Sequence, residues 1–377
     1  MTISRIRLVV SLSRPPVLAL LALFAATGMA QAGGGDDATR LTLVLLVVGS
    51  FVVSAVALND VADEAIDRVN LPDAGDRPLV AGTGGRTDLR IVAAAAAALA
   101  VLAAAAIGPA AVLVVVGGLL LGVCYSVGPA RLAARGAIAS MSLPAGYVAV
   151  PYLLGLLAAR GSVRLGDLPL LGGLYVGFVG RILLKDFRDV AGDALFGKRT
   201  FLVRHGRRRT CAASAVCWVV GSVSLLGVRH PTPALVAAQV AWVVVAIGLL
   251  RALGVDGGHR RDERLISAIA IVGRGMLLTL LAHLGTTAAR WPAAGATAVL
   301  AGILLVHLGQ AHTMVRCGPR CRIRVPEAWS AGGAELAHHV HLVPVGAVLD
   351  HPAVRDLEVV GEAELELVPR RRDRALG

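Results

Sequence analysis

Ten long apolar segments constrain the fold of this chain more than any other feature of its sequence. Apolar runs of about 17 residues or more are long enough to cross the hydrocarbon core of a membrane as helices. The chain is 56% apolar and only 16% charged, whereas soluble domains carry about 25% charged residues. A soluble all-helical core would need helices with polar faces, and most of these segments have none. The sequence therefore predicts an all-α fold, a polytopic membrane helical bundle with nine or ten transmembrane helices.

The predicted spans leave two places that need a special structure. The spans lie at residues 16–31, 41–58, 91–107, 109–125, 137–158, 168–184, 210–228, 234–250, 265–285 and 294–310. Gly108 and Pro109 must form a tight turn between two spans. Arg274 falls near the middle of the ninth span, where a charge is costly unless it faces protein or water.

The first span allows two interpretations. It follows a basic start and ends in the small residues AQA, which is also the pattern of a signal peptide. Because the next span begins about ten residues later, a helical hairpin is the simpler interpretation.

The distribution of basic residues predicts how the spans are oriented. With the N-terminus inside, the inside segments hold 24 lysines and arginines and the outside loops hold 5. This asymmetry follows the positive-inside rule, so we expect a multi-pass protein of the cell membrane with both termini cytoplasmic. The net charge of +12 therefore needs no nucleic-acid partner, and the RRRDR stretch at residues 370–374 is expected to meet anionic lipid headgroups.

The character of the chain changes after about residue 313. We expect a membrane domain over residues 1–313 and a cytoplasmic tail over residues 314–377, as a small appendage or partly disordered. Apolar–polar alternation predicts two or three short strands in the tail. The tail could instead hold a zinc site, with the candidate ligands Cys317, Cys321, His338, His339 and His341. The C-x-x-x-C spacing of the two cysteines is not the usual one for zinc. The five cysteines of the chain predict no disulfide framework.

The stretch NDVADEAIDRVN, residues 59–70, places four acids directly after the second span. On a helix with about 100° per residue, all four fall within about 140° of Asn59; they are Asp63, Asp67, Asp60 and Glu64, in that order. Like charges on one helix face repel each other, so we expect a cationic partner beside them.

A second acidic stretch, KDFRDVAGDALFGKRT, follows the sixth span on the same side of the membrane. Its aspartates Asp186, Asp189 and Asp193 repeat the i, i+3, i+7 spacing found in the first stretch. Mg²⁺ prefers carboxylate oxygens and shares its coordination shell with substrate phosphates. Mg²⁺ ions that bridge the two stretches to a diphosphate would remove the repulsion and stabilise a departing diphosphate.

Basic residues flank both acidic stretches, where a bound anion would need them: Arg77, Arg181, Lys185 and Lys198. The chain has only two lysines and two asparagines, and all four fall in or beside these stretches. Two other interpretations stay open from the residues alone. Each stretch could be a solvated interfacial loop, or a transporter could hold a divalent cation, although a transporter would place its acids near the bilayer midplane.

Together these residues resemble the UbiA superfamily of intramembrane prenyltransferases over about residues 10–310. The first acidic stretch, followed by DRPLVAG, is similar to the signature N-D-x-x-D-x-x-x-D. The second is similar to the signature D-x-x-x-D with its following Gly-Asp and Gly-Lys-x-Thr. CYSVGPARL, residues 124–132, resembles the family's tyrosine-containing loop, and the Arg14-Pro15 pair also fits.

The resemblance implies a bundle around a central cavity, capped on the cytoplasmic side, that transfers a prenyl group from its diphosphate to an aromatic or other lipophilic acceptor. It implies Mg²⁺ as cofactor, bound by Asn59, Asp60, Asp63, Asp67, Asp186, Asp189 and Asp193. The diphosphate would be bound by Arg77, Arg131, Arg181, Lys185 and Lys198. The catalytic residues would be Asp63, Asp67, Asp189, Asp193, Lys185 and Tyr125, with Tyr125 donating to the diphosphate or steadying a developing cation.

The chain departs from the family pattern in several places. The family commonly has nine spans, so either the 265–285 segment is an addition or the count divides one helix wrongly. Arg131 stands where many members have lysine, NLPDAGDRP lengthens a loop, and the tail is not part of the usual pattern. A membrane terpene cyclase with the same fold is the alternative activity. Candidates to face a cation are Tyr125, Tyr147, Tyr152, Tyr175 and Phe178.

Overall fold

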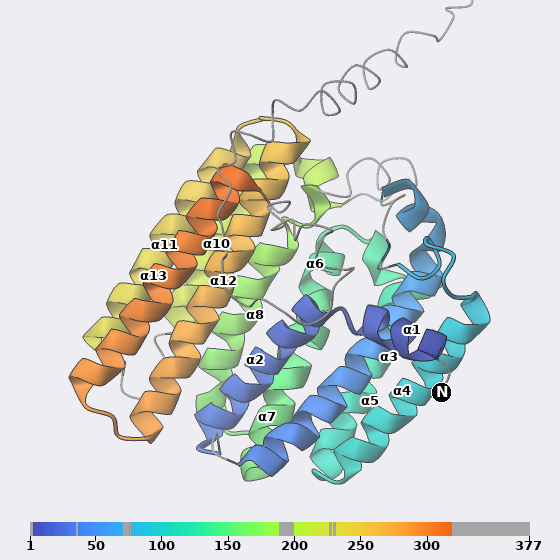
Figure 1. The fold of residues 1–377 in the computed structure, drawn as a ribbon, viewed down its shortest axis with the longest axis horizontal. Coiled ribbons are helices and arrows are strands. Elements are labelled where there is room, and N and C mark those ends of the chain that lie inside the picture. Colours follow the sequence, from blue (N-terminus) through green and yellow to red (C-terminus); the bar gives the residue numbers. More distant parts are fainter. Residues whose placement is uncertain are drawn as a thin grey trace, which may run out of the picture. The chain divides into compact units, whose positions relative to one another are not determined.

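The computed structural model describes residues 3–34, 37–70, 75, 77–187, 200–225, 228 and 231–318, all of which belong to one compact unit, Met1–Cys321 (Figure 1). Over these ranges the chain forms helices and no strand, which confirms the predicted fold class. The tail's predicted strands, and its zinc candidates other than Cys317, lie outside the described residues.

The helices follow one another with short connections. The first half contains α1 (Ile3–Ser13), α2 (Pro15–Ala32), α3 (Ala38–Asn70), α4 (Arg86–Ala105) and α5 (Pro109–Ser126). The middle contains η1 (Leu132–Ala134), α6 (Ala137–Pro144), η2 (Ala145–Ala149), α7 (Val150–Arg160), η3 (Leu165–Asp167) and α8 (Leu168–Ile182). The last part contains α10 (Phe201–Leu225), α11 (Pro233–Gly254), α12 (His259–Ala288) and α13 (Ala293–Cys317).

The predicted spans correspond to these helices. Within the described ranges, nine helices or helix runs are long and apolar enough to cross a membrane. The predicted span 137–158 is such a run, made of α6, η2 and α7. α10 is not among the nine, because its first part is basic and Gly206, with φ 77°, interrupts the helix. The predicted turn between α4 and α5 is confirmed, since Gly108 has φ 145° and Pro109 begins α5.

The helices pack in a ring. α2 contacts α3 and α7, α3 contacts α4 and α5, and α8 contacts α10. α12 closes the ring because it packs against both α11 and α2. Two glycines bring α2 and α7 into backbone contact: a Cβ on Gly28 would lie 2.1 Å from Tyr152 O, and a Cβ on Gly155 would lie 2.1 Å from Ala25 O. This close crossing packs α2 directly against α7.

The helix that stands outside the ring is α13, at the edge of the bundle in Figure 1. It packs against α11 and α12, and few of its residues are buried. The predicted segment 265–285 lies in α12, a single helix that closes the ring, so the count did not divide one helix wrongly there. Arg274 is exposed on the surface of α12.

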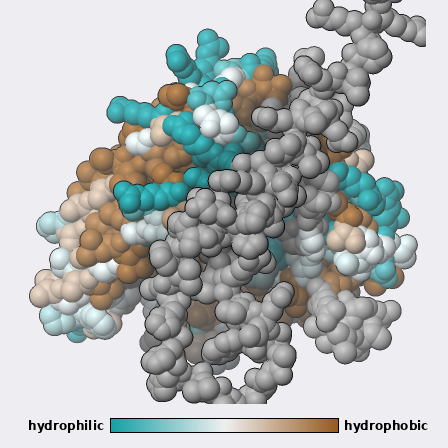
Figure 2. Space-filling view, turned by 45° about the horizontal axis from the view of Figure 1, so that its top comes forward, coloured by the Kyte–Doolittle hydropathy of each residue, from teal (hydrophilic) through white to brown (hydrophobic). Residues whose placement is uncertain are grey.

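Hydrophobic side chains cover the outside of these helices (Figure 2). They include Val240 and Val244 on α11 and Leu305 and Val306 on α13. In Figure 2 hydrophobic residues dominate the left side of the bundle, and hydrophilic residues gather at its top. This surface suits a bundle that is surrounded by lipid.

Candidate functional site

The acidic stretch 59–70 continues α3 as one uninterrupted helix of 33 residues. No proline occurs in α3, so the helix extends past its apolar part and the predicted spacing of the acids is realised. Asp60 and Asp63 are buried, at 3% and 9% exposure. Glu64, at the edge of this face, has partners of its own, because its carboxylate accepts hydrogen bonds from Arg68 at 2.9 Å and Arg86 at 2.5 Å.

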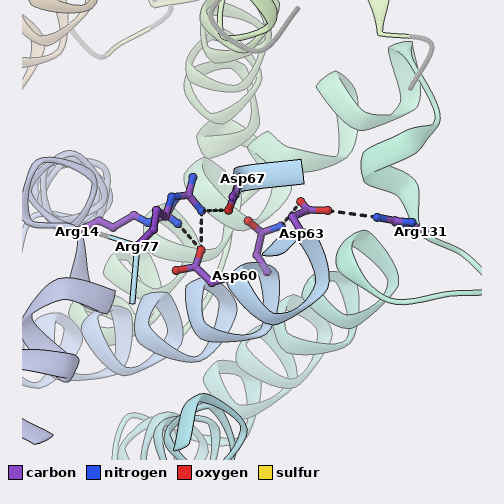
Figure 3. Close-up of polar contacts among 7 residues, drawn as sticks. Arg14, Asp60, Asp63, Asp67, Arg77 and Arg131 are labelled. Atoms are coloured by element: carbon purple, nitrogen blue, oxygen red, sulfur yellow. Dashed lines mark hydrogen bonds and ion pairs between the residues drawn. The ribbon is translucent and has the colours of Figure 1, made fainter. Parts of the chain in front are cut away.

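Two arginines from outside α3 hold Asp60 (Figure 3). Arg14 Nη2 lies 2.5 Å and Arg77 Nη1 lies 2.6 Å from Asp60 Oδ1. Arg77 Nη1 also donates to Asp67 Oδ2 at 2.7 Å, so one guanidinium bridges two acids that lie about two turns apart on the same face of α3. Arg14 occupies the joint between α1 and α2 with φ 42°, and the two prolines that follow begin α2.

Asp63 has partners on its own helix and on the loop after α5. Asn59 Nδ2 donates to Asp63 Oδ2 at 3.0 Å, one turn away on α3. Arg131 Nη2 lies 3.4 Å from Asp63 Oδ1 (Figure 3), and its side chain remains 44% exposed. Arg131 therefore reaches Asp63 from the solvent side.

The end of α8 brings the predicted basic residues to the same region. Lys185, in the turn after α8, donates from Nζ to Tyr125 OH at 3.3 Å and so connects α8 with the end of α5. Arg181 Cζ lies 5.7 Å from the centre of the Phe178 ring, within the range of a cation–π contact. Asp186 is buried at 4% exposure.

A cavity of about 400 Å³ joins these groups, a volume within the usual range for a small-molecule site. Eight of the predicted site residues line it: Asn59, Asp63, Asp67, Arg77, Tyr125, Arg181, Lys185 and Asp186. Asp60 and Arg131 contact these residues but do not line the cavity. The predicted residues Asp189, Asp193 and Lys198 lie outside the described residues.

Other cavity residues are not among those predicted for the site. Arg14 lines the cavity, and its only sequence signal is the Arg-Pro pair before the first span. Two polar lining residues lie in stretches that resemble the family, since Ser126 follows Tyr125 in its loop and Thr200 ends the Gly-Lys-x-Thr of the second stretch. Ser140, another polar lining residue, lies in no such motif. The deeper wall is apolar and includes Leu20, Phe51 and Ile269, from helices far apart in sequence.

The donor set of the cavity fits a hard divalent cation. Its oxygens come from Asn59, Asp63, Asp67 and Asp186, and Mg²⁺ takes carboxylate and amide oxygens as ligands. In the structure, arginines lie beside the carboxylates of α3. Among the described residues, no three His, Cys, Asp or Glu side chains lie close enough together to hold a metal ion. The acids of the second stretch that would complete such a cluster lie outside the described residues.

Residues 20–268 match a model of the UbiA prenyltransferase family. The chain is 30% identical over 278 residues to a digeranylgeranylglyceryl phosphate synthase of Methanothermobacter thermautotrophicus, which covers 71% of this chain and 92% of that relative. It is 32% identical over 196 residues to the synthase of Halobacterium salinarum, and this match covers 51% of the chain and only 64% of the relative's length.

The fold is also similar to two solved structures. One is a digeranylgeranylglyceryl phosphate synthase in membranes, with a TM-score of 0.57, 17% identity, and coverage of 74% of this chain and 97% of that chain. The other is a UbiA homologue from Archaeoglobus fulgidus bound to DMAPP and Mg²⁺, with a TM-score of 0.54, 18% identity, and coverage of 72% and 99%.

Proposed function

Because this chain belongs to the UbiA prenyltransferase family, we propose that it transfers a prenyl group from a prenyl diphosphate to a lipophilic acceptor in the membrane and releases diphosphate. One observation carries this proposal. The acids of α3 and the basic end of α8 line one cavity whose deeper wall is apolar. Such a cavity suits a substrate with a charged head and a hydrocarbon tail.

The charged head would lie between Lys185, Arg181 and Arg77, whose side chains all line the cavity. Lys185 would hold the diphosphate oxygens, and Tyr125, already in hydrogen-bonding contact with Lys185, would donate its hydroxyl to them. Charge-assisted hydrogen bonds of this kind are stronger than those between neutral groups.

Mg²⁺, when bound, would supply positive charge that stabilises the diphosphate as it departs. The residues that would hold it are Asn59, Asp63, Asp67 and Asp186, together with Asp189 and Asp193 of the second stretch. Asp60 is bound to Arg14 and Arg77 and does not line the cavity. We therefore assign Asp60 the positioning of these two arginines.

In the transfer step, the bond between the allylic carbon and the diphosphate oxygen breaks and its electron pair leaves with the diphosphate. An electron pair of the acceptor then bonds to the allylic carbon, and the acceptor's proton passes to the released diphosphate. The apolar cavity wall, which includes Phe51 and Phe178, would exclude water from the allylic cation.

The archaeal relatives indicate one class of acceptor. Their product, digeranylgeranylglyceryl phosphate, is by its name a glyceryl phosphate with two geranylgeranyl groups. A prenylated glyceryl phosphate is therefore the first acceptor to test on this chain, and a lipophilic aromatic compound is the second.

We further propose that the mouth of the cavity and both termini face the cytoplasm. The support is the charge asymmetry of the sequence, with 24 basic residues in the segments on that side and 5 in the opposite loops. Cysteine-accessibility labelling of Arg90→Cys and Arg290→Cys in intact cells would test this orientation, since the two positions fall on opposite sides in the proposed topology.

The experiment that tests the function uses the full chain in lipid vesicles with Mg²⁺, radiolabelled geranylgeranyl diphosphate and each acceptor in turn. We expect label to appear in a prenylated acceptor and to be lost when EDTA removes Mg²⁺. A labelled cyclic hydrocarbon formed without acceptor would indicate a terpene cyclase instead. No consumption of any prenyl diphosphate, together with Mg²⁺ flux across the vesicle membrane, would refute the enzyme proposal.

A further inference from the structure

A second, apolar pocket of about 50 Å³ lies beside the central cavity, between α2, α8, α10 and α12. Leu20, Phe178 and Arg181 line both the cavity and this pocket, so the two are adjacent. Apart from Arg181 and Ser222, the pocket is lined by apolar side chains and glycines.

The position of the pocket along α8 places it deeper than the charged end of the cavity. Arg181 is near the end of α8, beside Lys185 and Asp186. At about 1.5 Å of rise per residue, Phe178, Gly177 and Leu174 lie about 4.5, 6 and 10.5 Å further along the helix. A hydrocarbon chain whose diphosphate is held near Arg181 would meet Phe178 first and the pocket beyond it.

Phe178 forms the wall between the two spaces. Its ring stacks on Tyr147 at a centroid distance of 5.9 Å and meets Phe24 edge to face at 5.8 Å. Tyr147 lines the central cavity, whereas Phe24 lines the second pocket. A change in the rotamer of Phe178 would therefore connect the two.

Glycines on α8 and α10 explain why space remains there. A Cβ on Gly221 would lie 2.8 Å from both Gly173 O and Gly177 N, so the two backbones touch at these positions. A Cβ on Gly177, in contrast, would meet no atom within 4 Å. Gly177 lines the pocket, so its missing side chain leaves part of the pocket open.

From these contacts we infer that the second pocket binds the distal isoprene units of the prenyl diphosphate, and that Gly177 and Phe178 set the longest prenyl chain that binds. This inference rests on the proposed function. A short prenyl group would end in the central cavity before Phe178, and a long one would displace the ring and enter the pocket. Gly177→Leu would fill the pocket from α8 without a backbone collision.

The experiment measures binding and so needs no acceptor. The full chain in lipid nanodiscs with Mg²⁺ is titrated with dimethylallyl, geranyl and geranylgeranyl diphosphate in displacement of a labelled prenyl diphosphate. One methylene in an apolar pocket changes discrimination by about tenfold or more. We therefore expect Gly177→Leu to raise the ratio of the dissociation constants for geranylgeranyl and dimethylallyl diphosphate by at least about tenfold, with Gly177→Ala between it and the wild type.

Gly172→Leu is the matched control, because Gly172 lies on the same helix, is exposed, and would also place its Cβ more than 4 Å from other atoms. Its ratio should equal that of the wild type. If the wild type binds the diphosphates and Gly177→Leu leaves the ratio unchanged, the inference is wrong and the proposed function stands. If the wild type binds none of them with Mg²⁺, the proposed function fails and the inference with it.

Discussion

Arg77→Met should make the stability of this protein strongly dependent on Mg²⁺. Arg77 is 15% exposed and bridges Asp60 and Asp67, whose side chains are 3% and 13% exposed. Removing one partner of a buried ion pair costs about 3–5 kcal/mol, because the other charge stays buried without compensation. Arg14 still binds Asp60 in the variant, so we expect a loss near the lower limit, about 3 kcal/mol.

Mg²⁺ bound at Asp63 and Asp67 would replace the missing positive charge. A ligand present at 100 times its dissociation constant stabilises the folded state by about 2.7 kcal/mol, so saturating Mg²⁺ should recover most of the loss. The assay is thermal unfolding in nanodiscs over a series of Mg²⁺ concentrations, without substrate. We expect a larger Mg²⁺-dependent rise of the unfolding midpoint in Arg77→Met than in the wild type.

Arg86→Met provides the control. Arg86 binds Glu64 at 2.5 Å, but its side chain is 61% exposed, and exposed pairs contribute at most about 1 kcal/mol. Its response to Mg²⁺ should match that of the wild type. An equal Mg²⁺ response in wild type and Arg77→Met would refute the view that the cation and Arg77 neutralise the same carboxylates.

Three further predictions follow from the site and the bundle. Asp63→Asn should lower kcat/KM for prenyl transfer by at least about 100-fold, because losing an outer-shell partner of a metal already costs up to about that much. Asp189→Ala in the second stretch should have the same effect. Full activity in either variant would contradict the metal-binding role of that residue. Tyr125→Phe removes the hydroxyl that contacts Lys185 at 3.3 Å. Because a hydrogen bond to a charged group is worth about 1.5–3 kcal/mol, kcat/KM from steady-state kinetics should fall by about tenfold or more. An unchanged kcat/KM would exclude this hydroxyl from diphosphate binding. Arg207→Met breaks the paired hydrogen bonds between α10 and α12 that Arg207 donates to buried Asp262, one of them 2.9 Å long. The variant should unfold at a lower temperature, with a loss of about 3 kcal/mol in the free energy of unfolding. Its KM for the prenyl diphosphate should stay unchanged, and a changed KM would link this pair to the site.

The fold class could be predicted from the sequence because membrane spans are defined by local composition. Each apolar run needs only its own residues to satisfy its backbone hydrogen bonds as a helix. The closure of the ring by α12 and the outer position of α13 could not be predicted, because the apolar composition of each segment identifies a span but not the helices it packs against. Their places depend on close contacts such as Gly275, where a Cβ would lie 2.6 Å from Trp242 of α11.

The family could be predicted as well, and the match over residues 20–268 confirms it. The two acidic motifs sufficed because their spacing is local. The different roles of the individual acids, however, depend on residues that are distant in sequence. Asp60 and Asp63 look alike in the motif, yet only Asp63 lines the cavity. Which way each carboxylate turns depends on Arg14 and Arg131, which lie 46 and 68 residues away in sequence.

The repulsion among the acids of α3 must be offset by positive charge, and the structure shows which residues supply it. Four acids on one helix require positive charge nearby, and from the sequence that charge is expected from Mg²⁺ and basic residues. In the structure Arg14, Arg77 and Arg131 already supply it at 2.5, 2.6 and 3.4 Å. A site that must receive both a cation and a diphosphate benefits from such pairs, because the buried acids stay compensated before either ligand binds. Mg²⁺ bound at Asp67 would compensate that carboxylate in place of Arg77, and the Arg77 guanidinium, still held by Asp60 at the cavity wall, could then donate to the diphosphate.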